Sequence, residues 1–395
     1  MDAKVENNVL KIALDGRIDS NNAGETEKEI LEIWEANTAD SCVIDVEHLE
    51  YISSAGLRVL MKLRKKSKKP LDVINASNEV YDIFQVTGFT ELLNVKKKLR
   101  EVSVEGCEMI GSGGYGKVYR IDPETIVKLY NPGISAEFVE GERAQAQKTF
   151  LLGVPTAISY DVVRCGDCYG LVFEMLNADT VAHIISSDSA KVSEYAGRMA
   201  ELIKELHKIE VQEGELPDRR EKVKEWVNTL KGFLTDEEID KILFYLSSIP
   251  KRQTFLHGDF HTKNVMEQNG ELVLIDVGDA AVGHPIFDIA QMYLCYGFLA
   301  DAVRQGRQPK ELIGFPVELA EPMWRGQIKA YFGLSDEEEI DKKIAMIFPL
   351  ACLLAAYHGL SIRGEISDDM KRAILDGLLC KQGIPAMEKA SEVIW

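Results

Sequence analysis

The first hundred residues alternate between two hydrophobic periods. Apolar residues at helical spacing predict three helices, and the short apolar runs between them predict three strands. The predicted helices are 23–36, 55–66 and 79–87, and the predicted strands are 8–14, 42–46 and 71–74. Alternating strands and helices with short connections indicate a small α/β domain over residues 1–100. The basic segment 96–100 is interpreted as a short connection to the next domain, with a strand edge or a solvated helix end as alternatives.

The rest of the chain divides into a part rich in predicted strands and a part rich in predicted helices. Residues 103–176 are rich in predicted strands and punctuated by glycine and proline, with one clear helix over 136–152. From about residue 188 onward the apolar positions take helical spacing. The acidic run 336–339 follows Ser335 at capping-box spacing, so it is interpreted as the first turn of a helix and not as a metal site.

Composition and charge narrow the classes of function. The 395 residues are 46% hydrophobic and carry a net charge of −18, which argues against binding to nucleic acid. The longest apolar stretch, 345–357, is shorter than the roughly 18 residues of a membrane span, so we expect no membrane contact. Seven sparse cysteines and the absence of a visible signal peptide favour a cytoplasmic location. Cys165 and Cys168 have redox or zinc spacing, but they lie between two apparent strands and are interpreted as flanking a hairpin turn.

A glycine-rich segment supplies the first candidate chemistry. Gly111, Gly113 and Gly116 are spaced so that a tight turn can bring backbone N–H groups against phosphate oxygens. A dinucleotide-binding loop with this spacing opens a helix, whereas here Val118 continues into a strand. The pattern therefore predicts a glycine-rich hairpin, and the strand that follows places Lys128 beside it.

A carboxylate on the next helix can pair with this lysine and hold it against phosphates. Glu142 is the preferred partner, with Glu137 and Glu140 close enough in sequence to compete.

The second candidate segment is His257-Gly-Asp-Phe-His-Thr-Lys-Asn264. Asp259 and Asn264 lie five residues apart on a tight loop, so that Asp259 can accept a hydroxyl proton and Asn264 can hold a metal ion. A hairpin with a turn at 269–270 then returns the chain to the same place and delivers Asp276 as a second metal ligand.

These motifs resemble the aminoglycoside phosphotransferase/choline kinase branch of the protein-kinase-like fold. The matching residues run from the HGD-x4-N loop through Ile275-Asp276 to the G-x-P and D-x-A stretch that contains Asp288. The resemblance implies an α+β bilobal domain, with a strand-rich lobe over 101–178 and a helical lobe over 179–395. It further implies ATP and Mg²⁺ as cofactors, a structural role for Asp288, and adenine bound by backbone groups of the segment from Glu174 to Leu176.

The class of phosphoryl acceptor is predicted from protein-kinase motifs that the sequence lacks. His257-Gly-Asp259 replaces the H-R-D of protein kinases, no A-P-E motif follows, and only 11 residues separate Asp276 from Asp288. A peptide-binding activation segment needs more chain than that, so a small hydroxylated molecule is favoured, and an atypical protein kinase stays open as the alternative.

The first domain carries its own motif, Tyr51-Ile-Ser-Ser-Ala-Gly56, in which a strand ends where a helix begins. A serine there is a good helix cap, and a phosphate would also be stabilised at that position. The pattern resembles the STAS domain of anti-sigma factor antagonists, in which Ser54 falls on the phosphorylated position and Asp19 on a nearby acidic position. Ser53 stands where that family has an acid.

Together these patterns predict an ATP-dependent phosphotransferase that acts on a hydroxyl of a small molecule, joined to a STAS-like domain that regulates it or binds a protein partner such as an anti-sigma factor. Two other readings stay open. One is an atypical protein kinase that phosphorylates a STAS-domain serine in the same or another chain. The other is a catalytically idle binding protein of the anti-sigma factor antagonist type.

Overall fold

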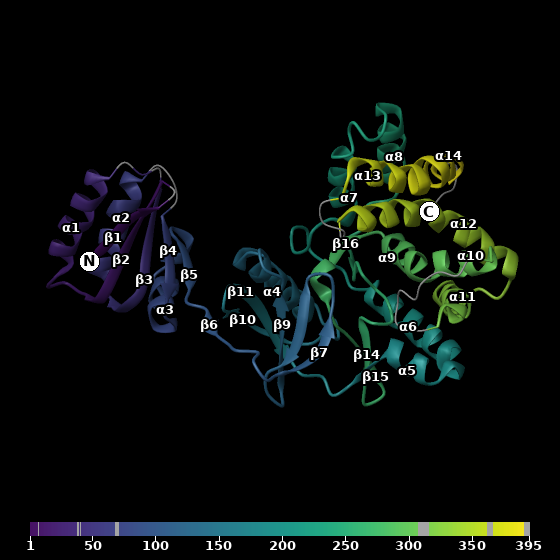
Figure 1. Ribbon diagram of the computed structural model, residues 1–395, viewed down its shortest axis with the longest axis horizontal. Helices are drawn as coiled ribbons and strands as arrows, with labels where there is room; N and C mark the ends of the chain where they lie inside the picture. The colour runs from purple at the N-terminus through teal and green to yellow at the C-terminus, as the bar shows by residue number, and fades with distance from the viewer. Residues whose placement is uncertain are drawn as a thin grey trace. The chain divides into compact units, whose positions relative to one another are not determined.

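The chain folds into two compact units, Met1–Val102 and Ser103–Trp395 (Figure 1). The computed structural model describes all residues except 7, 38, 40, 68–70, 307–315, 362–365 and 391–395. Each unit has a hydrophobic core of its own.

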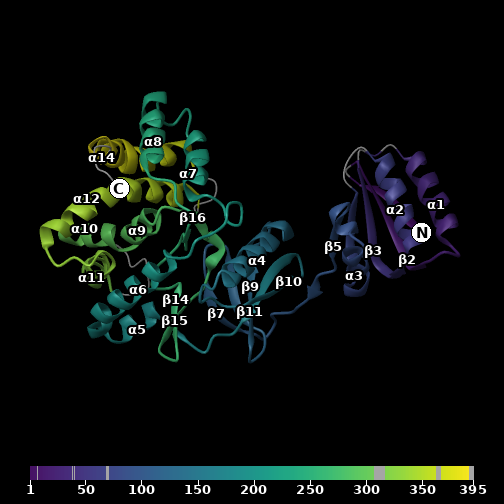
Figure 2. The same ribbon diagram turned by 180° about the vertical axis from the view of Figure 1, so that it is seen from behind.

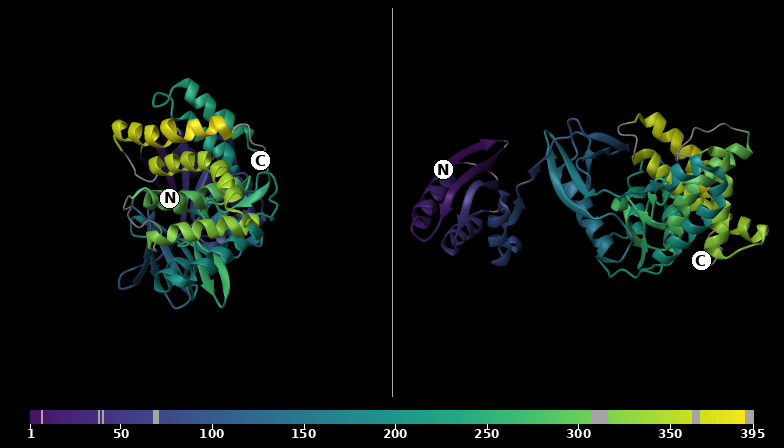
Figure 3. Two further views of the ribbon diagram at one scale, coloured as in Figure 1. Left: turned by 90° about the vertical axis from the view of Figure 1, so that its right-hand side faces the viewer. Right: turned by 90° about the horizontal axis from the view of Figure 1, so that it is seen from below.

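The first unit is a five-stranded sheet covered by three helices. Its strands, in the order in which they lie in the sheet, are β1 (Asp2–Glu6), β2 (Val9–Ile18), β3 (Ser41–Ile52), β4 (Asp72–Ala76) and β5 (Asn94–Lys97). Only β1 is antiparallel to its neighbour. The connecting helices are α1 (Ala23–Ala36), α2 (Ser54–Lys66) and α3 (Asn78–Val86). Since the parallel strands follow one another in sequence, right-handed crossovers place all three helices on one face (Figure 3, right).

The predicted α/β architecture of this unit is confirmed. The pattern of apolar residues did not predict β1, and a strand edge was only an alternative for segment 96–100, which overlaps the end of β5. Both are short and rich in charge, and β5 carries two of the three lysines that were read as a connection. Charged edge strands bury little apolar surface, so periodicity alone does not reveal them.

The second unit begins with a six-stranded sheet in the order β6-β10-β11-β9-β8-β7. The strands are β6 (Arg100–Glu101), β7 (Glu108–Ser112), β8 (Gly116–Arg120), β9 (Thr125–Tyr130), β10 (Ser159–Cys165) and β11 (Cys168–Glu174). Helix α4 (Ala136–Leu151) packs against β10 and β11. Cys165 and Cys168 are paired across the β10–β11 turn and both are free thiols, as the hairpin interpretation predicts.

The remainder of this unit is a helical lobe that contains two small sheets. The helices are α5 (Val181–Ser187), α6 (Val192–Leu206), α7 (Arg219–Asn228), α8 (Asp236–Ser248), α9 (Ile286–Met292), α10 (Phe298–Arg304), α11 (Ala320–Phe332), α12 (Glu337–Ser361), α13 (Asp368–Leu375) and α14 (Ile384–Ala390). One small sheet joins β12 (Asp179–Thr180), β14 (Val265–Gln268) and β15 (Glu271–Leu274), and the other joins β13 (Thr254–Leu256) to β16 (Ala281–Gly283). The β14–β15 hairpin lies between the large sheet and helices α5 and α6 (Figure 2).

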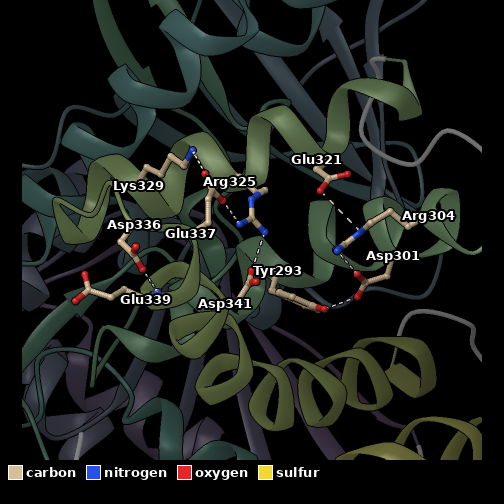
Figure 4. Close-up of polar contacts among 10 residues, drawn as sticks. All are labelled: Tyr293, Asp301, Arg304, Glu321, Arg325, Lys329, Asp336, Glu337, Glu339 and Asp341. Atoms are coloured by element: carbon tan, nitrogen blue, oxygen red, sulfur yellow. Dashed lines mark hydrogen bonds and ion pairs between the residues drawn. The ribbon is translucent and has the colours of Figure 1, made fainter.

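Ion pairs connect α11 to the start of α12 (Figure 4). Arg325 contacts Glu337 and lies 2.9 Å from Asp341, and Lys329 lies 2.6 Å from Glu337. Asp336 caps the helix by accepting the backbone N–H of Glu339. The acidic run is therefore the first turn of a helix, as predicted, but the cap is Asp336 and not Ser335.

Two helical stretches within the described residues are long and apolar enough to cross a membrane, Ile286–Arg304 and Glu337–Leu360. The first is 78% buried inside the protein. The second contributes Ile347, Leu350 and Leu354 to the core of the second unit. That stretch is 44% buried inside the protein. Core helices of globular proteins pass the same test of length and composition, and the burial of the first stretch is that of a core helix.

Candidate active site

The glycine-rich segment forms the hairpin between β7 and β8. The backbone N–H of Gly113 donates to the carbonyl of Gly116 at 2.9 Å, and Gly111 pairs with Val118 across the strands. Gly116 lies so close to the next strand that a Cβ there would approach the carbonyl oxygen of Leu129 to 2.1 Å. The sequence thus requires glycine at this position for packing.

Lys128, on β9, lies between two carboxylates. Its Nζ is 2.7 Å from Glu142 Oε1 on α4 and 2.8 Å from Asp276 Oδ1. Burial opposes its charge, but Asp276 and Glu142 outweigh that effect and raise the pKa of the Lys128 ammonium above its usual range. Of the competing acids, Glu140 pairs with Arg143 instead, and Glu137 is exposed in the first turn of α4.

The carboxylate of Asp259 is held on both of its oxygens. Asn264 Nδ2 donates to Oδ2 at 3.1 Å, and Gln291 Nε2 donates to Oδ1 at 3.0 Å. His261 Nε2 lies 3.4 Å from Oδ2. Burial works against the charged form, but the contacts with His261 and the field of His257 hold the pKa of the Asp259 carboxyl below its usual range. Asp259 is therefore an oriented and ionised carboxylate at neutral pH.

A second buried aspartate fixes the loop that carries Asp259. Asp288, at the start of α9, accepts the backbone N–H groups of His257 and Gly258 at 2.9 and 2.8 Å. Its Oδ2 also lies 3.2 Å from His207 Nε2, and His207 Nδ1 lies 2.7 Å from the hydroxyl of Tyr331. The structural role that the resemblance implies for Asp288 has a direct geometric basis. His207 supports this anchor.

Asp276 has a backbone conformation that is unusual for a residue with a side chain. The β14–β15 hairpin turns at Asn269 and Gly270, with φ of 52° and 85°, and leads to Asp276 with φ of 57°. A left-handed backbone is uncommon at residues other than glycine, and such residues occur at turns and at functional sites. The following loop is held by Gln145, which donates to the carbonyl of Gly278 at 2.8 Å.

Asn264 and Asp276 have the donor chemistry for Mg²⁺. Because the Asn264 amide nitrogen is engaged by Asp259, its amide oxygen is the atom left to bind a cation, and Asp276 adds a carboxylate that is 49% exposed. Two oxygen ligands completed by substrate phosphates and water are typical of Mg²⁺ sites. The described residues contain no cluster of three or more His, Cys, Asp or Glu side chains that could hold a metal by themselves. The donor set therefore fits a cation that arrives with a nucleotide.

The segment that would face adenine leaves β11 at the junction of the two lobes. Glu174 Oε1 accepts the backbone N–H of Ile158 at 2.8 Å, and the backbone N–H of Met175 donates to the carbonyl of Glu124 at 2.7 Å. Leu176 follows and is buried. These bonds fix the path of the segment, and the expectation that Glu174 and Leu176 contact adenine stays a prediction.

In the first unit, two adjacent serines have different positions at the start of α2. Ser53 is the N-cap, and its Oγ accepts the backbone N–H of Ala55 at 3.2 Å. Ser54 is the first helical residue and is exposed. The backbone N–H of Ser53 donates to the carbonyl of Ile18, which places the loop of Asp19 beside the serines. The capping role considered for this motif thus belongs to Ser53.

The two lobes of the second unit, with charged groups meeting where they join, have the arrangement of a protein-kinase-like phosphotransferase. Residues 107–324 match the family model described as the phosphotransferase enzyme family (APH), and since the match covers more than half of the 395 residues, the chain belongs to this family. Residues 1–102 match the model of the STAS domain. Both resemblances and the predicted fold class are confirmed, and the protein is a phosphotransferase that carries a STAS domain.

The solved structures that resemble the chain have low sequence identity to it and TM-scores below 0.5. The gentamicin complex of APH(2″)-IIa is 19% identical, with a TM-score of 0.45 over 70% of this chain and 92% of that one. A choline/ethanolamine kinase family protein from Mesorhizobium loti is 12% identical, with a TM-score of 0.45 over 72% and 92%. ADP-bound aminoglycoside phosphotransferase APH(2″)-Ib is 19% identical, with a TM-score of 0.43 over 70% and 93%. No curated protein matches the sequence significantly.

Sequence reasoning missed Gln291 and Gln145, and it did not predict the contacts of His207 and His261 with the two aspartates. Gln291 lies three residues after Asp288, so both point from one face of α9 toward the same loop, and this helical spacing was the available signal. Gln145 follows Glu142 by three residues on α4 in the same way. A glutamine has no charge to attract notice, and only the fold shows what it contacts.

Proposed function

We propose that the protein transfers the γ-phosphoryl group of ATP to a hydroxyl group of a small molecule. The observation that carries the proposal is the double support of Asp259 by Asn264 and Gln291, at 3.1 and 3.0 Å. An exposed surface acid would be free to rotate, whereas this carboxylate is fixed in one orientation. Family membership and the Lys128–Glu142 pair agree with it.

The chemistry follows from the charges at the site. Phosphoryl transfer passes through a loose transition state, so positioning and charge stabilisation dominate. The glycine-rich hairpin and Lys128 bind and orient the phosphates. Asp259 orients the acceptor hydroxyl and takes its proton. Its low pKa makes it a weak base, which suffices when the proton leaves late. Asn264 and Asp276 would hold Mg²⁺, which would neutralise charge on the phosphates.

For the rest of the protein we propose a regulatory role and a cytoplasmic location. The STAS domain would bind a protein partner and thereby change the rate of the phosphotransferase. A cytoplasmic location agrees with an ATP-dependent reaction and with seven cysteines that are all free thiols.

The test is ATP turnover by the full chain with Mg²⁺, alone and with a panel of amino sugars, amino alcohols and sugars. Asp259→Asn is the matched variant, because it keeps the shape of the side chain and removes the charge. Stimulation by one compound class that falls by about 10²–10⁴-fold in the variant is the expected result. Equal turnover in wild type and variant would rule out this site.

A second candidate is phosphorylation of Ser54, since Ser53 provides the cap and leaves the exposed Ser54 at a helix start. Here ATP would label the protein itself. Mass spectrometry after incubation with ATP distinguishes the two: phosphate on Ser54 that is absent in Asp259→Asn supports transfer to protein, and unmodified Ser54 excludes it.

A further inference from the structure

Arg219, the first residue of α7, is a buried cation whose contacts with oxygen atoms are long. Its side chain is 2% exposed. Its closest oxygens are the carbonyl of Gly258, 3.5 Å from Nη2, and Asp279 Oδ1, 3.9 Å from Nη1. Charge-assisted bonds of a guanidinium are normally about 2.7–2.9 Å long. Nη1 has no hydrogen-bond partner among the described residues. Burial of a charge without close partners is unfavourable, so the arrangement calls for a further anionic group.

Neighbouring groups extend this positive site. Lys222, one turn along α7, lies 3.8 Å from the same oxygen of Asp279, and both side chains are 44% exposed. On α12, the ring of Tyr357 has the Arg219 guanidinium 5.7 Å from its centroid. The next residue, His358, has a buried Nε2 with no partner in the described part of the chain. The single carboxylate of Asp279 therefore lies near two cations, Arg219 and Lys222, at long distance from both. These three side chains together carry a net positive charge.

The cluster adjoins the loop that carries Asp259. Gly258, which Arg219 contacts, immediately precedes Asp259. His358 lies within the electrostatic field of Asp259 as well as that of Arg219. Of the groups that would hold the nucleotide phosphates and their cation, Lys128 and the glycine-rich hairpin belong to the other lobe, whereas Asn264 and Asp276 belong to the same lobe as Arg219. Because Arg219 contacts the residue before Asp259, an anion bound at Arg219 would lie close to a hydroxyl that meets Asp259.

We propose that Arg219, assisted by Lys222 and His358, binds a carboxylate or phosphate group of the acceptor, so that the substrate is an anionic hydroxyl compound. This inference rests on the proposed function. A planar guanidinium matches either group with two parallel N–H bonds. Tyr357 and Trp226, whose rings are 5.1 Å apart, border the cluster on its apolar side.

The binding test uses protein saturated with Mg²⁺ and the non-hydrolysable analogue AMP-PNP, so that the nucleotide phosphate sites are filled. Inorganic phosphate and malonate are then titrated, and the rise in melting temperature gives the affinity. We expect both anions to stabilise the wild type. Arg219→Gln should weaken binding by at least about tenfold, and the half-exposed Lys222→Gln, which leaves the buried side chains in place, by about threefold.

Lys224→Gln is the matched control. Lys224 lies on the same helix but pairs with Glu221 at 3.3 Å, so its loss should leave anion binding unchanged. Anion binding that is equal in wild type, Arg219→Gln and Lys222→Gln would overturn the proposal, as would absence of any stabilisation of the AMP-PNP complex. Failure of AMP-PNP itself to bind would instead contradict the proposed function.

The acceptor test compares three molecules with one carbon skeleton: glycerol, glycerate and glycerol 3-phosphate. Stimulation of ATP turnover by glycerate alone identifies a carboxylate, and stimulation by glycerol 3-phosphate alone identifies a phosphate. In either case Lys222→Gln should raise KM with little effect on kcat. Preference for neutral glycerol would count against an anionic acceptor.

Discussion

Gln291 is the residue whose replacement tests the site most directly. Gln291→Leu keeps the side chain near its original volume and removes the Nε2 donor that lies 3.0 Å from Asp259 Oδ1. A hydrogen bond to a charged group contributes about 1.5–3 kcal/mol. If that bond orients Asp259 in the transition state, its loss should lower kcat by about 10- to 150-fold, since 1.36 kcal/mol corresponds to a factor of ten.

Stability should respond differently from activity. Gln291 is 3% exposed, and its Oε1 is buried without a partner among the described residues. Leucine would remove this unsatisfied oxygen together with the useful nitrogen, so the free energy of unfolding should change by no more than about 1 kcal/mol. The assay is therefore kcat for ATP turnover with the best acceptor, measured beside a denaturant midpoint.

Gln327 on α11 supplies a matched control. It is also fully buried, its Oε1 lacks a partner in the described part of the chain, and its nearest partner is the sulfur of Met199 at 4.0 Å. Gln327→Leu should leave kcat unchanged. The reasoning is refuted if Gln291→Leu keeps the kcat of the wild type, or if both variants lose activity equally.

Three further predictions concern stability. Gly258→Ala should destabilise the second unit by at least about 1–3 kcal/mol, because φ is 84° and a Cβ would lie 2.2 Å from the carbonyl oxygen of Asp279; an unchanged denaturant midpoint would contradict this. Gly56→Ala places a Cβ 2.7 Å from Ile18 Cγ2 and should destabilise the first unit by about 1–3 kcal/mol. Amide hydrogen exchange in the STAS domain measures this loss of stability. The affinity for AMP-PNP should stay that of the wild type. Burial lowers the pKa of His284 from 6.5 to about 4. Between pH 6.5 and about pH 4 the unfolded chain therefore binds more protons than the folded chain, so the free energy of unfolding should fall as the pH drops through this range. The loss is about 2 kcal/mol after allowance for solvent screening, and His284→Gln should show a smaller loss in thermal melts from pH 7 to 4.

The features that sequence predicted well are set by residues adjacent in the chain. The turn at Asn269-Gly270 needs two consecutive left-handed residues, and only a few residue types adopt that conformation readily. The predicted helix 136–152 differs by one residue from α4, because Ser135 caps its start and Gly153 ends it. In the same way, the glycines between β7 and β8 specify a hairpin without reference to the rest of the fold.

The features that sequence did not predict depend on packing between distant segments. Asp288 and His207 are 81 residues apart, and no pattern in either segment indicates that they meet. Arg219 is among the most buried side chains of the protein, and its sequence neighbours Asp218, Arg220 and Glu221 are all charged, so the local pattern does not indicate burial. The sequence alone favoured Glu142 over Glu137 and Glu140 as the partner of Lys128. The contact between Lys128 and Asp276 joins the two lobes, and only the folded structure shows it.

The left-handed backbone of Asp276, with φ and ψ both 57°, determines which inactive form of the protein is informative. Alanine at this position would remove the carboxylate and also strain the backbone, so a loss of activity could come from either change. Asparagine tolerates this conformation and nearly preserves the shape of the side chain. Asp276→Asn is therefore the variant that tests the carboxylate alone, because it removes one charge and leaves the chain path intact.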